Sequence, residues 1–357
     1  MRTWGGIRVI GKVAGKRGPW TLAFAGLALG LVLGGGAVWI VPRLSASSAG
    51  TGVGAHPGAS VGANPSASVG ANTGANTGAT SSATGVRIAA VGDMACEAKS
   101  APANSKALLC RQQTVSDAVL AANPSLMLAL GDLQYEQGAP GKWDQYNSSY
   151  GRLKTITRPA PGNHEYLTPG AAGYYAYFPE WAGPSGNGYY SFDVGGWHVV
   201  SLNSECADAG GCGPGSPQYT WLKSDLDSHR TTCTLAFWHI PRFSSGEHGD
   251  HTAYGQWWQL LQGQKADLVL TGHDHDYERF AKLNADGQPD DQAGLRSFVV
   301  GTGGRNLRVG RTPHVGSEKF IDDAMGFMEL QLRPDSYSWR FLSIDGTALD
   351  QGEERCH

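Results

Sequence analysis

Short apolar runs recur along the chain after residue 86, and each is bounded by glycine-rich or polar turns. Five of them are soon followed by a side chain able to bind a metal ion, and these occupy residues 87–91, 126–130, 158–161, 234–238 and 267–270. Such short bounded runs are typical of buried strands. In open α/β sheets, active sites gather at the carboxyl ends of the strands. The pattern therefore predicts a buried sheet with a functional site at one edge.

Helical and hairpin patterns fill the intervals between these runs. Three helices are expected, over residues 111–122, 216–228 and 253–262. A hairpin is expected from the segments 189–193 and 197–202. Late strands are expected at residues 297–300, 326–332 and 336–343, the last two joined by a turn at Pro334-Asp335. Strands that alternate with helices indicate the α/β class.

The N-terminal part differs from the rest of the chain in its composition and charge. Residues 20–42 are uncharged up to Val41 and long enough to cross a bilayer as a helix. The preceding segment, residues 1–19, carries five basic residues, which places it in the cytoplasm and the rest of the chain outside. We expect a retained transmembrane signal anchor. The alternative is a cleaved signal peptide, with the small residues 45–49 as the cleavage region and a secreted product.

Residues 43–85 consist mainly of Gly, Ala, Ser, Thr, Val and Asn, too few of them large and apolar to form a core. This segment is expected to be a disordered tether between the anchor and a domain at residues 86–357. All six cysteines follow the tether, and an even number on an exported chain indicates disulfides. Local pairing would join Cys96 to Cys110 and Cys206 to Cys212, leaving Cys233 for Cys356. The sequence does not fix this connectivity.

Charge narrows the range of partners. All 31 acidic residues lie at or after Asp93, whereas seven of the 28 basic residues lie at or before Arg87. The chain from residue 88 onward therefore carries 21 basic and 31 acidic residues, a formal charge of −10. Such a domain is a poor electrostatic match for long polyanions. Nucleic-acid binding is disfavoured, although a local positive site can still attract one small anion.

The polar residues that follow the five runs each have an ordinary structural explanation. Asp93 and Asp132 could cap helices, Asn163 could hold a turn, and His239 could be a satisfied core histidine. The fifth run leads into Gly272-His273-Asp274-His275, and a His-x-His pair alone is a weak signal. Together, these explanations require five coincidences of position and residue type. Carboxylate, amide and imidazole groups are ligands for transition metals, so a shared metal site is the simpler interpretation.

These motifs resemble those of the calcineurin-like metallophosphoesterases. The order in that superfamily is an aspartate after a strand, then GD, GNH[ED], a histidine and GH-x-H. This order is matched by Asp93, Gly131-Asp132, Gly162-Asn163-His164-Glu165, His239 and Gly272-His273-Asp274-His275. Most members have Asp-x-His at the first motif, and here Ala95 takes the place of the histidine. The purple acid phosphatases also lack it and use a tyrosine in G-D-x-x-Y, which is similar to residues 131–135 here.

This resemblance implies a four-layer α/β/β/α sandwich of two packed mixed sheets flanked by helices. It also implies a dinuclear centre: Asp93, Tyr135 and His275 on the first metal, Asn163, His239 and His273 on the second, and Asp132 bridging through its two oxygens. A phenolate with two carboxylates suits Fe(III), and the second site suits Zn, Mn or Fe(II). His164 is implied as the proton donor or transition-state stabiliser, or alternatively as a residue that orients a ligand, and His248 as a substrate contact. His251 is expected at the surface.

The expected function is a membrane-tethered extracytoplasmic phosphatase that hydrolyses small phosphate monoesters, with a hydroxide between the two metals as nucleophile. The alternative within enzymes is a phosphodiesterase or nucleotide pyrophosphatase on the same centre. The aromatic residues between 171 and 188 could stack a base or only pack. A non-catalytic surface-binding module is a third hypothesis, disfavoured by the intact ligand set. The physiological ester and the oligomeric state are left open by the sequence.

Overall fold

The computed structural model describes residues 85–96, 110–184, 186–231, 233–308 and 312–357. The predicted cytoplasmic segment, transmembrane anchor and tether therefore lie outside the described residues, apart from the last residue of the tether. Within the described ranges, no helix has the length and apolar character needed to cross a membrane.

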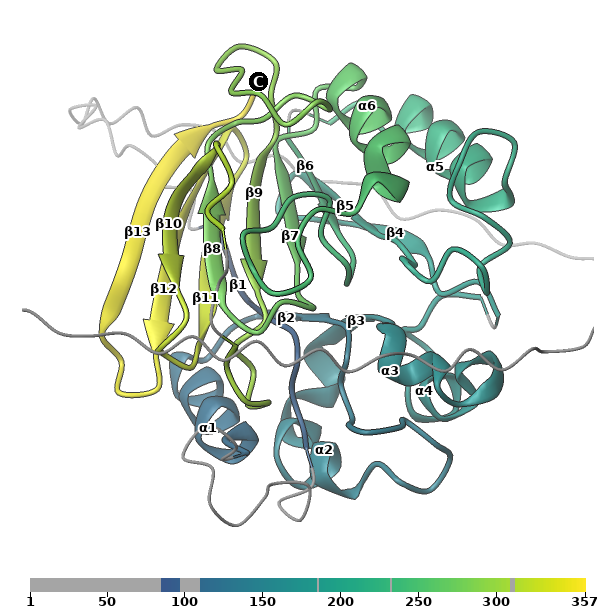
Figure 1. The fold of residues 1–357 in the computed structure, drawn as a ribbon, viewed down its shortest axis with the longest axis vertical. Helices are drawn as coiled ribbons and strands as arrows, with labels where there is room; N and C mark the ends of the chain where they lie inside the picture. Colours follow the sequence, from purple (N-terminus) through teal and green to yellow (C-terminus); the bar gives the residue numbers. More distant parts are fainter. Residues whose placement is uncertain (1–84, 97–109, 185, 232, 309–311) are drawn as a thin grey trace, which may run out of the picture. The chain divides into compact units, whose positions relative to one another are not determined.

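Two mixed sheets form the centre of the domain (Figure 1). The six-stranded sheet has the order β13-β12-β11-β1-β2-β3. Its strands are β1 (Val86–Val91), β2 (Leu126–Leu130), β3 (Thr157–Ala160), β11 (Gly326–Arg333), β12 (Ser336–Ser343) and β13 (Ala348–Arg355). Strands β1, β2 and β3 are parallel to one another, and β11 joins β1 in the antiparallel sense.

The seven-stranded sheet has the order β10-β8-β9-β7-β6-β5-β4. Its strands are β4 (Tyr190–Val194), β5 (Trp197–Ser201), β6 (Cys233–Phe237), β7 (Leu268–Thr271), β8 (Tyr277–Phe280), β9 (Arg296–Val300) and β10 (Ser317–Ile321). Strands β5, β6, β7 and β9 are parallel, whereas β4, β8 and β10 are antiparallel to their neighbours. Both sheets therefore have a parallel part, and each parallel part has one edge at which all carboxyl ends meet.

Side chains of the second sheet alternate between two cores. On β6, Leu235 and Phe237 belong to the cluster that also contains side chains of the first sheet, whereas Ala236 packs with the helices on the outer face. That outer layer consists of α5 (Pro217–Ser228) and α6 (Gly255–Gly263). Successive side chains of a strand point to opposite faces, so the two packed layers follow from the strand period.

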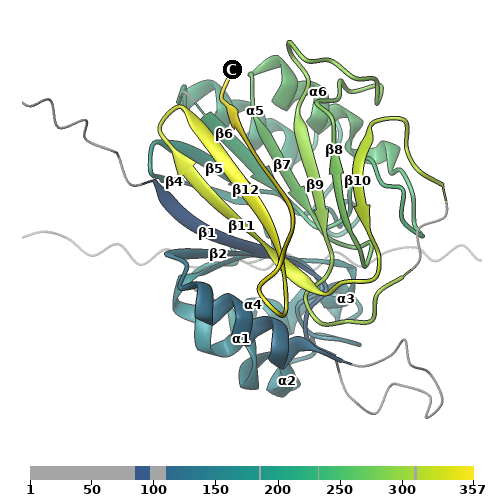
Figure 2. The ribbon, with the colours of Figure 1, turned by 90° about the vertical axis from the view of Figure 1, so that its left-hand side faces the viewer.

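The first sheet is covered by helices of its own. Figures 1 and 2 show α1 (Gln112–Ala122) and α2 (Asp144–Ser148) on the side of this sheet away from α5 and α6. The short helices α3 (Asn163–Tyr166) and α4 (Ala172–Tyr177) follow β3. The predicted arrangement of two packed mixed sheets flanked by helices is confirmed for the described residues.

The apolar runs located every strand that carries a motif, each within about one or two residues. Helix α5 begins at Pro217, as expected, because Ser216 accepts a hydrogen bond from the backbone N–H of Tyr219 and caps the helix. Three strands were missed, β8, β10 and β13. Their sequences contain charged residues at many positions, and their place as strands depends on pairing with distant neighbours rather than on apolar alternation.

Three disulfides connect the described cysteines, Cys96–Cys110, Cys206–Cys212 and Cys233–Cys356. The predicted pairing is confirmed. The third disulfide ties the C-terminus to the first residue of β6, across 123 residues of sequence. Disulfides of this kind are typical of proteins that fold outside a reducing compartment.

Candidate metal centre

The predicted ligand residues all lie at the carboxyl ends of parallel strands. Asp93 follows β1, Asp132 follows β2, Asn163 follows β3 and begins α3, and His239 follows β6. His273 and His275 follow β7, which lies next to β6 in the second sheet. The structure therefore brings together residues that are up to 182 positions apart, counted from Asp93 to His275. The two sheets each contribute one half of the site.

Three of these residues have a backbone conformation that non-glycine residues rarely adopt. The φ angles are 58° at Asp93, 50° at Asp132 and 73° at His273. Left-handed conformations of this kind cost free energy and concentrate at functional sites, where the surroundings hold them in place.

One set of ligand atoms converges on the hydroxyl of Tyr135. This hydroxyl lies 2.8 Å from Oδ1 of Asp93, 2.9 Å from Oδ2 of Asp132 and 3.2 Å from Nε2 of His275. Burial and then the two carboxylates raise the pKa of Tyr135 well above its ordinary value. One phenolic proton cannot satisfy three acceptors, so the arrangement calls for a cation. The donor set is the one predicted for the first metal.

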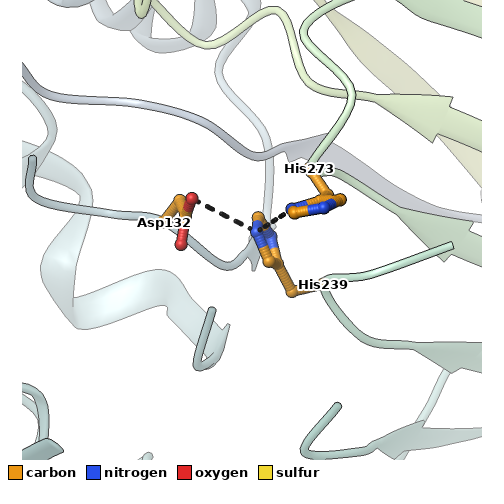
Figure 3. Close-up of side chains that lie close together, drawn as sticks. All are labelled: Asp132, His239 and His273. Atoms are coloured by element: carbon orange, nitrogen blue, oxygen red, sulfur yellow. Dashed lines mark hydrogen bonds and ion pairs between the residues drawn. The ribbon is translucent and has the colours of Figure 1, made fainter. Parts of the chain in front are cut away.

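A second set converges on Nε2 of His239. This atom lies 3.2 Å from Oδ1 of Asn163, 3.3 Å from Oδ2 of Asp132 and 3.3 Å from Nδ1 of His273. The ring of His239 donates from Nδ1 to the carbonyl oxygen of Leu130 at 2.8 Å, which leaves Nε2 as an acceptor in the neutral ring. Acceptors that face one another in a buried site again match a cation. Figure 3 shows Asp132 and His273 on either side of His239.

Asp132 belongs to both sets through a single atom. Its Oδ2 faces both Tyr135 and His239, whereas Oδ1 accepts the backbone N–H of His164 at 2.9 Å. The expectation that a bridge would use both carboxylate oxygens therefore differs from the structure. Burial alone would raise the pKa of Asp132, but the neighbouring His239 and His164 hold that pKa well below its ordinary value. The carboxylate is kept ionised, as a bridging ligand requires.

Hydrogen bonds to the far side of the imidazoles fix the orientation of the ligands. Nδ1 of His275 donates to the carbonyl oxygen of Asn306 at 2.6 Å, as Nδ1 of His239 does to Leu130. Such bonds select the tautomer that presents Nε2 to a metal. In the chain without metal, burial lowers the pKa of His239, but Asp132 outweighs it and raises this pKa to about 10. A proton shared with Asp132 then takes the position that a cation would hold.

Glu165 organises the loops that carry Asp132 and Asn163. Its fully buried carboxylate accepts backbone N–H groups of Asp132 at 3.1 Å, of Leu133 at 2.9 Å and of Gly162 at 2.8 Å. Burial, followed by the charge of Asp132, raises the pKa of Glu165 to about 8. The fourth residue of the GNH[ED] motif therefore holds the loop after β2 against the loop after β3.

His164 and His248 lie beside the ligands and not among them. Nδ1 of His164 lies 2.6 Å from the carbonyl oxygen of Glu136, which directs Nε2 toward Oδ2 of Asp132 at 3.8 Å. The ring of His248 lies 4.1 Å from that of His273, centroid to centroid. Both nitrogens of His248 have partners: Nδ1 lies 2.8 Å from Asp274, and Nε2 lies 3.0 Å from Nη1 of Arg308.

Sequence reasoning missed three residues at this site. His251 was expected at the surface, but it is half-buried, 5.7 Å from the ring of His273, and its Nε2 is buried without a partner among the described residues. The spacing His248-x-x-His251 was the available signal. Arg305 and Arg308 follow β9, whose carboxyl end lies at the same edge because β9 is parallel to β7. The rule used for the five runs, that site residues follow the carboxyl ends of parallel strands, applies to these two arginines as well.

The aromatic residues between 171 and 188 pack rather than form an open stacking surface. Tyr174 and Phe178 are fully buried, and Trp181 is covered by the guanidinium of Arg158 at 3.5 Å from its ring centroid. Of the two interpretations that the sequence left open, packing holds for these residues.

Comparisons with known proteins agree with this geometry. The family model for calcineurin-like phosphoesterases matches residues 86–277, more than half of the chain. The chain therefore belongs to the calcineurin-like phosphoesterase family. Within it, the chain is similar to purple acid phosphatases. It is 31% identical over 245 residues to purple acid phosphatase 18 of Arabidopsis thaliana, covering 63% of this chain and 54% of that protein. The chain thus spans about half the length of the curated relatives it matches.

Solved structures share the fold. The purple acid phosphatase PPD1 from yellow lupin seeds has a TM-score of 0.65 at 20% identity, covering 75% of this chain and 53% of that one. GAP50, described as the anchor in the inner membrane complex of Plasmodium, has a TM-score of 0.57 at 16% identity, covering 76% of this chain and 89% of that one. A protein named as an anchor shares the fold, so activity has to be argued from the site.

Proposed function

We propose that this chain is a dinuclear metal-dependent phosphomonoesterase. The observation that carries the proposal is the position of Asp132, whose Oδ2 faces both the Tyr135 hydroxyl and Nε2 of His239. A single carboxylate shared by two sets of acceptor atoms is the arrangement that two adjacent cations require. The first set, Asp93, Tyr135 and His275, suits Fe(III), and the second, Asn163, His239 and His273, suits Zn, Mn or Fe(II).

Two metal ions bound by these residues would supply Lewis acids for the phosphoryl oxygens and would activate a water as nucleophile. The residues of the chain supply the rest. Backbone carbonyls orient His239 and His275, and Glu165 fixes the loops that carry Asp132 and Asn163. His164 holds Nε2 over the same site because its Nδ1 is bound to the carbonyl of Glu136. In the protonated ring, Nε2 donates a proton to the leaving alkoxide.

We also propose that the domain works outside the cell, tethered to the membrane by residues 20–42. The uncharged length of that segment and the basic residues before it support this placement. Three disulfides in the described residues support an oxidising compartment. A fractionation experiment on cells that produce the full chain tests it. We expect activity in the membrane fraction and its release by a protease added from outside, and activity confined to the cytosol would contradict the proposal.

The activity is tested by elemental analysis of the purified chain together with hydrolysis of p-nitrophenyl phosphate and its bis ester. We expect two metal ions per chain and a higher kcat/KM for the monoester. Preference for the bis ester would instead identify a phosphodiesterase on the same centre. A chain that holds no metal and cleaves neither compound would be a binding module on the same fold.

A further inference from the structure

The segment that follows β9 is fixed to the ligand residues by backbone hydrogen bonds. The N–H of Arg305 donates to the carbonyl of Asp93 at 3.0 Å, and the N–H of Arg308 donates to the carbonyl of His275 at 3.1 Å. Both carbonyls belong to residues of the first metal set. Two arginines are therefore held at the rim of the centre by the same residues that are expected to bind the metal.

Arg305 lies beside the predicted proton donor. Its guanidinium carbon is 4.8 Å from the ring centroid of Tyr135, and the ring of His164 packs on the same tyrosine at 4.2 Å between centroids. Glu136 links the two residues: its carboxylate pairs with Nη2 of Arg305 at 2.7 Å, and its carbonyl oxygen accepts from His164. Nε of Arg305 is buried and has no hydrogen-bond partner among the described residues. This arginine thus borders the space that the leaving group would occupy.

Arg308 lies beside His248, the predicted substrate contact. Its Nη1 is 3.0 Å from Nε2 of His248 and 3.2 Å from Oε2 of Glu247. Because Nδ1 of His248 is engaged by Asp274, Nε2 of the neutral ring accepts from Arg308. His248 therefore holds the arginine in place, and the ring of His248 in turn packs against that of His273.

The charges paired with these arginines are more exposed than the arginines themselves. The side chain of Glu136 is 47% exposed and that of Arg305 is 17% exposed. The corresponding values are 38% for Glu247 and 29% for Arg308. A carboxylate at the rim can rotate toward the solvent when an anion binds to the arginine. The free energy lost is small, as is typical of exposed ion pairs. The planar guanidinium groups remain, and their geometry matches two phosphate oxygens.

We propose that Arg305 and Arg308 form a subsite for a second anionic group, carried by the leaving group of the substrate. The preferred substrates are then compounds in which the terminal phosphate is joined to another phosphate, as in a nucleoside diphosphate. This inference rests on the proposed phosphomonoesterase function and narrows its substrate class. In the hydrolysis of ADP, one P–O bond forms to water and the bond to the bridging oxygen breaks. The products are AMP and inorganic phosphate with the release of one proton.

ADP and AMP form a matched pair of probes, because they share base and sugar and differ in the charge of the leaving group. The measurement is kcat/KM for phosphate release from each, with the metal-loaded full chain. We expect the wild type to prefer ADP. Arg305→Gln and Arg308→Gln should each lower the ADP:AMP ratio by about tenfold, the scale of one charge-assisted hydrogen bond. Arg305→Lys and Arg308→Lys should retain part of the preference because they keep the charge.

Arg340→Gln is the matched control, since Arg340 on β12 forms an ion pair with Glu329 on β11, and neither strand carries a predicted metal ligand. It should leave the ratio unchanged. Melting temperatures of all variants establish whether they fold. Arg308 is the more exposed of the two arginines, so Arg308→Gln can still be tested if Arg305→Gln does not fold. An unchanged ratio in the double Gln variant would overturn the proposal. An equal loss of kcat/KM for both substrates is one such outcome, because it leaves the ratio unchanged.

Failure of the proposed function is separable from failure of the subsite. If the wild type cleaves neither p-nitrophenyl phosphate nor either nucleotide, the phosphomonoesterase proposal fails. The same variants are then titrated with ADP and with AMP by calorimetry. The subsite predicts tighter binding of ADP than of AMP in the wild type and loss of that difference in the double Gln variant. Equal affinities for ADP and AMP in the wild type would contradict it.

Discussion

The hydroxyl of Tyr135 lies 2.9 Å from Oδ2 of Asp132, and both groups are almost completely buried. The same oxygen also faces His239 at 3.3 Å. One carboxylate oxygen therefore connects the two sets of predicted ligands, each of which combines residues from both sheets. A change at either Tyr135 or Asp132 should therefore affect metal binding by both sets. This pair is the most direct place to test the dinuclear assignment.

Tyr135→Phe should remove one ligand of the first metal and leave the fold intact, because the ring is buried and phenylalanine fills the same space. If Fe(III) is bound through the phenolate, the purified wild type should absorb visible light and the variant should lose that band. We expect metal content to fall toward one ion per chain and kcat/KM to fall by about a hundredfold or more. Absorption spectra and elemental analysis provide the measurement.

Tyr177→Phe is the matched control, since its hydroxyl bonds to Asn147 on the surface. It should keep the spectrum, the metal content and the activity. A colourless and fully active wild type loaded with Zn or Mn would rule out the iron assignment. Unchanged metal content in Tyr135→Phe would rule out the tyrosine as a ligand.

Glu165→Gln should weaken the positioning of the loops at the site without replacing a predicted metal ligand. The amide nitrogen of glutamine cannot accept, so at least one of the backbone N–H groups of Asp132, Leu133 and Gly162 loses its partner. An unsatisfied buried group costs about 1–3 kcal/mol, and we expect a loss of unfolding free energy on this scale in urea titrations. Metal affinity should fall by about ten- to a hundredfold, as measured with a chelator.

Glu353→Gln, on an exposed position of β13, serves as the control for Glu165→Gln. It should change neither stability nor metal affinity. If Glu165→Gln lowered stability and left metal affinity untouched, the carboxylate would stabilise the fold without positioning the ligands.

His198 should make stability depend on pH at a place remote from the centre. Its Nδ1 lies 2.8 Å from Asp193 on β4, and its Nε2 lies 2.8 Å from Asp225 on α5, while the ring of His229 stacks on it. Burial lowers the pKa of His198, but the two carboxylates outweigh it and raise this pKa above 6.5. Burial would raise the pKa of Asp225, yet His198 and Ser191 hold it below 3.8.

The direction of the effect follows from these shifts. The raised pKa of His198 contributes stability that is complete below pH 6.5 and is lost as the pH rises through the folded-state value. The lowered pKa of Asp225 contributes stability that is lost only as the pH falls below 3.8. The stability difference between wild type and His198→Gln, from urea titrations, should therefore be largest near pH 5 and shrink toward pH 9. A difference that is constant over this range would contradict the ion-pair account.

The disulfides should differ in their contribution to stability. Chain-entropy reasoning gives about 5 kcal/mol for the 123-residue separation of Cys233–Cys356 and about 2 kcal/mol for the six-residue separation of Cys206–Cys212. Replacing both cysteines of a pair by serine, one pair at a time, provides the comparison in urea. We expect the larger loss for Cys233–Cys356. An equal loss for both pairs would show that local packing, and not chain entropy, dominates.

Much of the site was accessible from the sequence because each ligand follows a short apolar run. Asp93, Asp132 and His239 were predicted in this way, since a buried parallel strand needs a continuous apolar segment and ends in a turn. The same reasoning failed for β8 and β10, whose charged residues pair across the sheet and with distant carboxylates. Arg279 of β8, for example, pairs with Asp350 of β13. Contacts over such sequence distances leave no local pattern.

The order of the motifs, the candidate ligand types and the acidic character of the domain follow from the sequence alone. These are properties of residues and of their near neighbours in the chain. Only the tertiary structure decided that a single oxygen of Asp132 faces both sets of predicted ligands, that His248 is engaged by Arg308, and that the half-buried His251 lies near His273. Such relationships depend on the angle and distance at which two sheets pack, and no periodicity in a sequence encodes those quantities.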